Sequence, residues 1–247
     1  MMCGRDGVAT FVLVHGGHHG GWCYKKVARK LQAKGHIVYA PSMTGMGERE
    51  HLRFAGMNLD THITDIVRIL EVDDLSDAIL VGHSYGGMII TGVADRATNR
   101  VAHRVYLDAA YPTNGQSLLE HAGRAIAPLQ QTMRVIDGVE LVGFPEHMPP
   151  QAFGITDPDD IAFTAARLGP QPWACYTQHL ILANEAAMRA IPESHIICTS
   201  TIPGRDMELL KARSQGRVWD IDTGHDLMIT EPDWTAARLE EVAASMV

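Results

Sequence analysis

The segment Gly82-His83-Ser84-Tyr85-Gly86 contains the residue types that most directly suggest chemistry in this chain of 247 residues. It matches the pattern G-x-S-x-G and lies between a predicted buried strand, 78–81, and a predicted helix, 88–95. A serine on such a sharp strand-to-helix turn has a strained backbone, and glycines two positions away avoid a collision across the turn. The pattern predicts that Ser84 is a nucleophile; the alternative is a glycine-rich turn with an incidental serine.

A serine hydroxyl is a weak nucleophile and needs a general base. Of the 13 histidines, His225 differs from the others in its position. It lies in the loop Thr223-Gly-His-Asp226, directly after a predicted strand at 217–221, and it follows Ser84 in the chain. We therefore predict that His225 is the base, and the alternative is a solvent-exposed loop histidine.

Two carboxylates compete for the third role, which is to orient the imidazole and stabilise its cation. Asp108 ends a predicted strand, 101–107, immediately after the strand and helix that flank Ser84. Asp206 follows a later predicted strand, but it also begins a predicted helix, where an acidic residue stabilises the first turn. We predict Asp108 as the acid, with Asp206 as the runner-up and Asp222 as a weaker candidate.

An oxyanion formed during acyl transfer needs two N–H donors. One donor is expected from Tyr85, directly after the nucleophile. The second is expected from the loop His15-Gly-Gly-His-His-Gly-Gly21, whose glycines allow the backbone to approach a substrate closely. His18 and Trp22 in and beside this loop, and Trp173 further along the chain, are candidate substrate contacts.

The predicted elements alternate between strands and helices. This order favours a mostly parallel, twisted sheet with helices on both faces. The alternation stops at Pro112 and resumes near residue 193, so we predict an α/β core in 1–111 and 193–247 and an inserted helical lid in 112–192. The strands are expected at 10–14, 37–40, 78–81, 101–107, 194–198 and 217–221, and the helices at 22–34, 61–70, 88–95, 206–215 and 231–246, with helical pieces of the lid around 116–122, 158–168 and 173–190.

Composition limits the functional classes. Apolar residues make up 46% of the chain and the formal net charge is −8, which gives no electrostatic support for binding nucleic acid. No apolar run reaches 18 residues, and the first strand does not resemble a signal peptide, so we expect neither a membrane span nor secretion. Four scattered cysteines, at positions 3, 23, 175 and 198, are expected to be unpaired thiols in the cytoplasm. The sequence leaves open whether the chain forms a homodimer.

The chain resembles the α/β-hydrolase superfamily, and within it the group of plant methylesterases, hydroxynitrile lyases and related bacterial esterases. The resemblance rests on Phe11–Trp22, Leu80–Met88, Val105–Ala109 and Thr223–Asp226. It implies the α/β-hydrolase fold, assigns Ser84 and His225 as nucleophile and base, and assigns Gly17 and Tyr85 as the oxyanion-hole donors. We expect neither a cofactor nor a metal.

Two departures from the plant lyases argue against cyanohydrin cleavage. Asp226 follows the predicted base where those lyases have a lysine, and Gly16 stands where they have a threonine. A dehalogenase would need a carboxylate in place of Ser84. A cofactor-free dioxygenase, and a non-catalytic receptor for a small molecule, stay open as alternatives on the same fold.

We therefore expect an esterase that cleaves a small carboxylic ester in two steps through an acyl-enzyme. An amide, a carbamate or a lactone would suit the same residues. Apolar side chains in the predicted lid suggest a hydrophobic substrate, although each of them can equally serve the packing of the lid. They are Phe144, Met148, Phe153, Phe163, Trp173, Leu180 and Met188.

Overall fold

The computed structural model describes residues 7–246. Its strands are β1 (Thr10–Val14), β2 (Ile37–Tyr39), β3 (Ala78–His83), β4 (Val101–Leu107), β5 (Arg134–Ile136), β6 (Val139–Val142), β7 (Gln171–Pro172), β8 (Glu193–Cys198) and β9 (Val218–Ile221). Its α-helices are α1 (Lys25–Ala33), α2 (Leu59–Val72), α3 (Gly86–Arg96), α4 (Leu118–His121), α5 (Gly123–Ile126), α6 (Pro158–Ala165), α7 (Ala174–Thr177), α8 (Glu185–Ala190), α9 (Met207–Arg213), α10 (Leu227–Thr230) and α11 (Pro232–Ala244).

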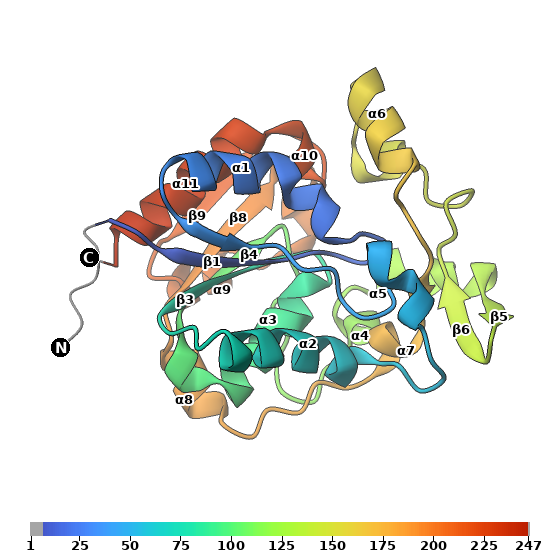
Figure 1. Cartoon of the computed structure of the whole chain (residues 1–247), viewed down its shortest axis with the longest axis horizontal. Coiled ribbons are helices and arrows are strands. Elements are labelled where there is room, and N and C mark those ends of the chain that lie inside the picture. Colours follow the sequence, from blue (N-terminus) through green and yellow to red (C-terminus); the bar gives the residue numbers. More distant parts are fainter. Residues whose placement is uncertain (1–6, 247) are drawn as a thin grey trace.

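A parallel sheet of six strands forms the centre of the fold, in the order β2-β1-β3-β4-β8-β9. Helices α1 and α11 cover one face of this sheet, and α2 and α3 cover the other (Figure 1). The sequence prediction of a mostly parallel sheet between two layers of helices is therefore confirmed.

Strands β1 and β3, inside the sheet, are buried because both of their faces carry apolar side chains. In β1, Phe11 and Leu13 join the cluster beneath α1 and α11, whereas Val12 and Val14 join the cluster beneath α2 and α3. Successive side chains of a strand point to opposite faces, so a continuous apolar run fills both layers. The whole of β3 is buried in the same way.

The parallel strands bring their carboxyl ends to one edge of the sheet, where ligands bind in folds of this kind. The loop that follows β1 contains Gly17, the turn after β3 contains Ser84, β4 is followed by Asp108, and the loop after β9 contains His225. Segments that are far apart in the sequence therefore meet at this edge.

The segment 112–192 differs in part from the helical lid expected from the sequence. It contains a small antiparallel sheet in the order β5-β6-β7, besides short helices, and this sheet lies beside the main body (Figure 1). Asp137 and Gly138 connect β5 to β6, both with positive φ, at +51° and +77°. An Asp-Gly pair between two β-rich runs is a strong hairpin signal, and it accounts for the strands found here in place of a helix.

The helix expected over 173–190 is also interrupted. Helices α7 and α8 form its two ends, and an extended stretch separates them. In that stretch the N–H of Leu180 donates to Gln116 O, and the carbonyl of Leu180 accepts from Gly115 N–H. Asp95 accepts from the N–H groups of Ala183 and Asn184. These long-range hydrogen bonds outweigh the local helical preference.

Candidate active site

The turn between β3 and α3 holds Ser84 in a left-handed conformation, with φ of +53°. Such a φ is unfavourable for a residue with a side chain, and it persists here because the neighbours fix the turn. Ala110 N–H donates to Ser84 O at 3.0 Å, and Ser84 N–H donates to Leu107 O at 3.3 Å. A Cβ at Gly87 would lie 1.9 Å from Ala110 O, so this position requires glycine.

His225 and Asp108 form a direct contact, in which the ring nitrogen Nδ1 lies 2.5 Å from the carboxylate oxygen Oδ2. Because a carboxylate oxygen only accepts, His225 Nδ1 carries the proton. The ring is 28% exposed, whereas Asp108 is fully buried. Within residues 7–246, no hydrogen bond occupies the other ring nitrogen, Nε2.

Three further donors hold the second carboxylate oxygen of Asp108. They are the Thr201 hydroxyl at 2.6 Å, the Arg205 guanidinium at 2.7 Å and the Cys198 N–H at 3.3 Å. Burial by itself would raise the pKa of Asp108, but the hydrogen bond and charge of His225, the charge of Arg205 and the Thr201 hydroxyl hold it well below its usual range. Asp108 is therefore a carboxylate at neutral pH.

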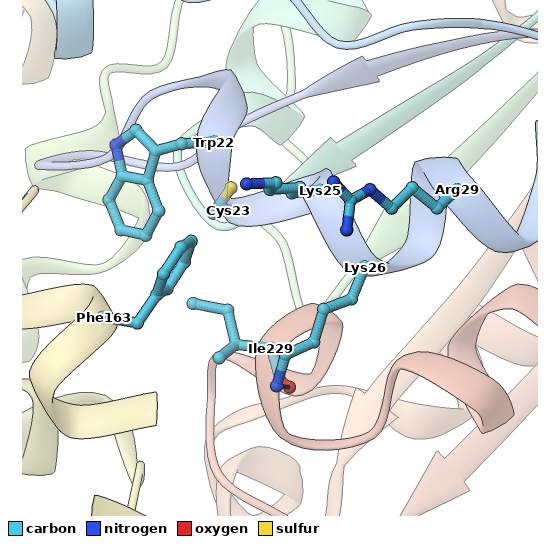
Figure 2. A pocket seen from close by; sticks show the side chains of 7 residues that line it. All are labelled: Trp22, Cys23, Lys25, Lys26, Arg29, Phe163 and Ile229. Carbon is cyan, nitrogen blue, oxygen red and sulfur yellow. Dashed lines mark hydrogen bonds between the residues drawn. The ribbon is translucent and has the colours of Figure 1, made fainter. Parts of the chain in front are cut away.

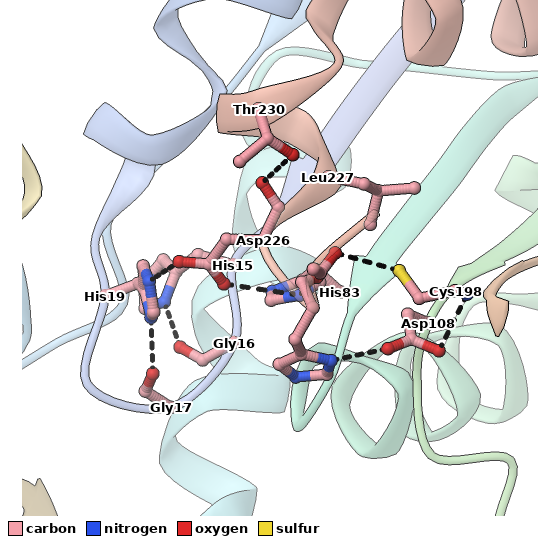
Figure 3. A network of polar contacts seen from close by, with 12 residues as sticks. His15, Gly16, Gly17, His19, His83, Asp108, Cys198, Asp226, Leu227 and Thr230 are labelled. Carbon is pink, nitrogen blue, oxygen red and sulfur yellow. Dashed lines mark hydrogen bonds and ion pairs between the residues drawn. The ribbon is translucent and has the colours of Figure 1, made fainter. Parts of the chain in front are cut away.

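The backbone of the loop after β9 is anchored on both sides of the base. His83 Nε2 donates to His225 O at 2.9 Å, and the Cys198 thiol donates to Gly224 O at 3.0 Å (Figure 3). The two rings of His83 and His225 lie 4.6 Å apart. In the described residues the Ser84 hydroxyl and the His225 ring are not joined by a hydrogen bond; such bonds are often long before substrate binds.

The backbone N–H groups of Gly17 and Tyr85 donate to no acceptor within the part of the chain that the structure describes. The neighbouring Gly16 lies against the nucleophile, since a Cβ at Gly16 would be 2.9 Å from Ser84 Cβ. His15 fixes the peptide between Gly16 and Gly17, because its Nδ1 donates to Gly16 O at 2.7 Å. These positions suit two donors beside a reacting carbonyl.

His18 connects the loop after β1 to the segment 112–192. Its φ is +68°, and its backbone and ring bond to Gly169, Gln171 and Tyr176. Nδ1 faces the Gly169 carbonyl and must donate, so Nε2 accepts from the Tyr176 hydroxyl at 3.2 Å. Burial lowers the pKa of His18 to about 4, which keeps this ring neutral. Tyr176 itself reaches Gly17, where a Cβ would be 1.9 Å from its oxygen.

Trp22 and Trp173, the other two predicted substrate contacts, both pack against other aromatic side chains. Trp22 lines a surface cavity of about 210 Å³ with Phe163 and the basic side chains of α1 (Figure 2). Neither Ser84 nor His225 lines that cavity. Trp173 is buried in the main core, with its ring 6.2 Å from that of Tyr176. A substrate contact by either tryptophan stays a prediction.

Asp206 and Asp222, the alternative acids, have structural partners. Asp206 is exposed and caps α9, where its carboxylate accepts from Leu209 N–H at 3.0 Å. Asp222 accepts from the Thr199 hydroxyl at 2.9 Å. The structure therefore brings Asp108, and neither alternative, against His225.

Sequence reasoning missed several residues of the site. Thr201 and Arg205 follow β8 in a stretch without a recognisable motif, and Tyr176 lies on a helix of four residues. A buried carboxylate needs compensating donors, and this need could have indicated Arg205 as a partner of Asp108. No group of three or more His, Cys, Asp or Glu within residues 7–246 is arranged to hold a metal ion.

The remaining sequence expectations concern cysteines and membranes. Cys23, Cys175 and Cys198 are buried free thiols, and Cys3 lies outside the described residues. None of the helices that the structure describes has both the length and the apolar character that a bilayer crossing requires.

Comparison with known proteins places these features in context. The model of the alpha/beta hydrolase family matches residues 11–238. A carbendazim hydrolyzing esterase from Nocardioides sp. (strain SG-4G) is 36% identical over 242 residues, which are 94% of this chain and 98% of the relative. Shorter stretches match putative methylesterases of Arabidopsis thaliana, one of them 36% identical over 44% of this chain and 28% of that relative.

Solved structures show the same fold at lower identity. A methylesterase protein from Arabidopsis has a TM-score of 0.75 at 21% identity, covering 96% of this chain and 99% of its own. Tomato methylketone synthase I, in complex with 2-tridecanone, has a TM-score of 0.77 at 19% identity, covering 97% and 99% of the two chains. The resemblance to methylesterases and bacterial esterases stated from the sequence is therefore confirmed.

Proposed function

This chain belongs to the α/β-hydrolase family and is an esterase, and we propose that it cleaves a small carboxylic ester with Ser84, His225 and Asp108 as its catalytic residues. The observation that carries this proposal is the 2.5 Å contact between His225 Nδ1 and the buried Asp108. It fixes the imidazole in the tautomer whose Nε2 can accept a proton.

In the proposed reaction His225 Nε2 takes the proton of the Ser84 hydroxyl while the serine oxygen attacks the ester carbonyl. The N–H groups of Gly17 and Tyr85 donate to the resulting oxyanion. His225 then gives the proton to the leaving alcohol, and an acyl-Ser84 ester forms. A water molecule, deprotonated by His225, attacks that ester and releases the carboxylic acid and free Ser84. Every step uses residues of this chain and water.

The test is turnover of p-nitrophenyl butyrate by Ser84→Ala. We expect the activity to fall by about 10⁶-fold, because serine and histidine of such a triad act as one unit. Ser214→Ala is the matched control, since Ser214 is also buried but lies at the end of α9, and it should retain wild-type turnover. Wild-type turnover by Ser84→Ala would exclude Ser84 as the nucleophile.

A carbamate ester is a second candidate substrate. Its support is the relative described as a carbendazim hydrolyzing esterase, which matches nearly the whole chain, and carbendazim is a methyl carbamate. The Tyr176 hydroxyl donates to His18, so its oxygen is left to accept an N–H of a bound carbamate. Methanol release from carbendazim by the purified protein tests this candidate, and no release above that of Ser84→Ala would reject it.

A further inference from the structure

Asp226, the residue after the proposed base, does not face solvent but is fully buried against His19 of the loop after β1. Asp226 Oδ2 lies 2.9 Å from His19 Nε2, and both side chains are buried. The other ring nitrogen of His19, Nδ1, lies 2.6 Å from Gly17 O. One histidine thus contacts both the oxyanion-hole loop and the loop that contains His225 (Figure 3).

The hydrogen bonds determine the protonation of His19. A carbonyl oxygen and a carboxylate oxygen can only accept, so both ring nitrogens must donate and the ring is an imidazolium. Burial disfavours that charge, but the carboxylate of Asp226 and the bond to Gly17 O raise the pKa of His19 above its ordinary value. Burial would likewise raise the pKa of Asp226, and the charge and hydrogen bond of His19 lower it instead.

Within residues 7–246, Asp226 is the carboxylate that pairs with His19, and His83 approaches Asp226 Oδ1 only to 3.8 Å. Burial lowers the pKa values of His15 and His83 to about 3, so these rings stay neutral. The other titratable neighbours of the pair within the described residues are His18, His225, Tyr24, Cys23 and Cys198.

The backbone of Gly17 explains why its carbonyl needs a hydrogen bond from His19. The Tyr176 oxygen occupies the space of a Cβ, so a side chain cannot restrict the backbone at this position. A glycine is free to adopt many φ and ψ values, and its N–H direction is then poorly defined. His15 holds the carbonyl of the peptide before Gly17, and His19 holds the carbonyl of the peptide after it. The two bonds together restrict the orientation of both peptide planes that flank Gly17.

We propose that His19 and Asp226 are a positioning pair, in which Asp226 holds a buried His19 imidazolium against the Gly17 carbonyl and thereby aims the Gly17 N–H at the developing oxyanion. The inference rests on the proposed esterase function of the same site. Neither residue touches substrate. The pair also gives a role to the residue that differs from the lysine of the plant lyases.

The kinetic test compares Asp226→Ala with Asp226→Asn on p-nitrophenyl butyrate. The asparagine amide can still donate to a neutral His19 whose Nδ1–H stays on Gly17 O, so this variant should keep most of kcat. Asp226→Ala should lower kcat by between about tenfold and 10²-fold, with KM changed less, because a small displacement of an oxyanion donor affects the transition state. Affinity for a trifluoromethyl ketone, which forms an oxyanion on Ser84, should fall in parallel with kcat.

Asp95→Ala is the matched control, since Asp95 is also a buried carboxylate but accepts from Ala183 and Asn184 N–H groups on the α3 side of the fold. It should destabilise the protein without the selective loss of kcat. Equal kcat in the Asp226→Ala and Asp95→Ala variants would overturn the proposal, as would a loss in Asp226→Asn as large as in Asp226→Ala.

A second measurement applies even if Asp226→Ala does not fold. Nitrogen-15 NMR of wild-type protein should show both ring nitrogens of His19 protonated above the ordinary pKa of histidine. A single protonated nitrogen at neutral pH would overturn the proposal. The failure of the esterase function itself is recognised separately, because wild-type protein would then neither hydrolyse the ester nor react with a fluorophosphonate, whatever the state of His19.

Discussion

Two histidine–carboxylate pairs lie at the same edge of the sheet, and their surroundings differ. His225 uses one ring nitrogen on Asp108 and is 28% exposed, so its Nε2 is left for a proton transfer. His19 is buried and uses both nitrogens, one on Asp226 and one on Gly17 O. The same two residue types can thus form a general base with its acid or a buried positioning pair. The difference is whether one ring nitrogen of the histidine is left without a hydrogen bond.

The largest expected difference between the two pairs is in kcat. Asp108→Asn should lower kcat for p-nitrophenyl butyrate by about 10⁴-fold, because the amide no longer holds the required tautomer of His225. Asp226→Asn should keep most of kcat, since His19 can lose its charge and keep its hydrogen bond to Gly17. Steady-state kinetics of both variants provide the comparison. Similar losses in the two would mean that the pairs do not have separate roles.

Stability against pH is expected to distinguish the buried pair. Asp226 has a lowered pKa and His19 a raised one, so their contribution is present above the ordinary carboxyl pKa and below the ordinary histidine pKa. The difference in unfolding free energy between wild type and Asp226→Asn should therefore be widest, at about 1 to 3 kcal/mol, between about pH 4 and 6.5. It should narrow as pH rises through the raised pKa of His19 or falls through the lowered pKa of Asp226.

Urea unfolding at several pH values measures this difference. Asp95→Asn is the control, because no histidine within residues 7–246 pairs with Asp95 and the alkaline narrowing should be missing. A difference for Asp226→Asn that stays constant up to alkaline pH would contradict a charged His19.

Arg205 gives a smaller effect on the first pair. Its guanidinium donates to Asp108 at 2.7 Å and offsets part of the negative charge that His225 experiences. The charge of Arg205 also helps to keep the pKa of Asp108 low, and without the guanidinium the carboxylate is held less firmly against His225. We expect Arg205→Gln to lower kcat for p-nitrophenyl butyrate several-fold, less than Asp108→Asn does, in steady-state kinetics. An unchanged kcat would show that Arg205 does not act on the pair.

Asp206 should give the smallest effect. Since it caps α9 and does not contact His225, Asp206→Ala should lower stability by about 1 kcal/mol and leave kcat within twofold of wild type. Thermal unfolding and steady-state kinetics on the same preparation measure both. A large loss of kcat in this variant, with Asp108→Asn still active, would exchange the roles of the two aspartates.

Much of the fold could be predicted from local sequence patterns. Continuous apolar runs such as 10–14 indicate buried parallel strands, and the turn around Ser84 has a sequence signature that depends on neighbouring residues. His225 and Asp108 could be proposed because they directly follow strands, whose carboxyl ends meet at one edge. The structure of the predicted lid was harder to predict from the sequence. Long-range hydrogen bonds, such as the one from Leu180 N–H to Gln116 O, interrupt the helix expected around 173–190.

The second pair could not be predicted from the sequence. His19 and Asp226 are 207 positions apart, and neither has a motif that indicates a partner. In the sequence, Asp226 was visible only as a departure from the lysine of related lyases. Its role depends on the distance between the loop after β1 and the loop after β9. That distance follows from the order of the strands and the packing of the elements around the sheet, and local residue spacing does not show it.

The central claim is that Ser84 is a nucleophile activated by His225, and covalent labelling tests it most directly. Wild-type protein, incubated with a fluorophosphonate and digested for mass spectrometry, should carry the phosphonyl group on Ser84. The His225→Ala variant should react far more slowly, and Ser84→Ala should not be labelled in this peptide. Absence of the modification from folded wild-type protein, or equal labelling in the His225→Ala variant, would contradict the account.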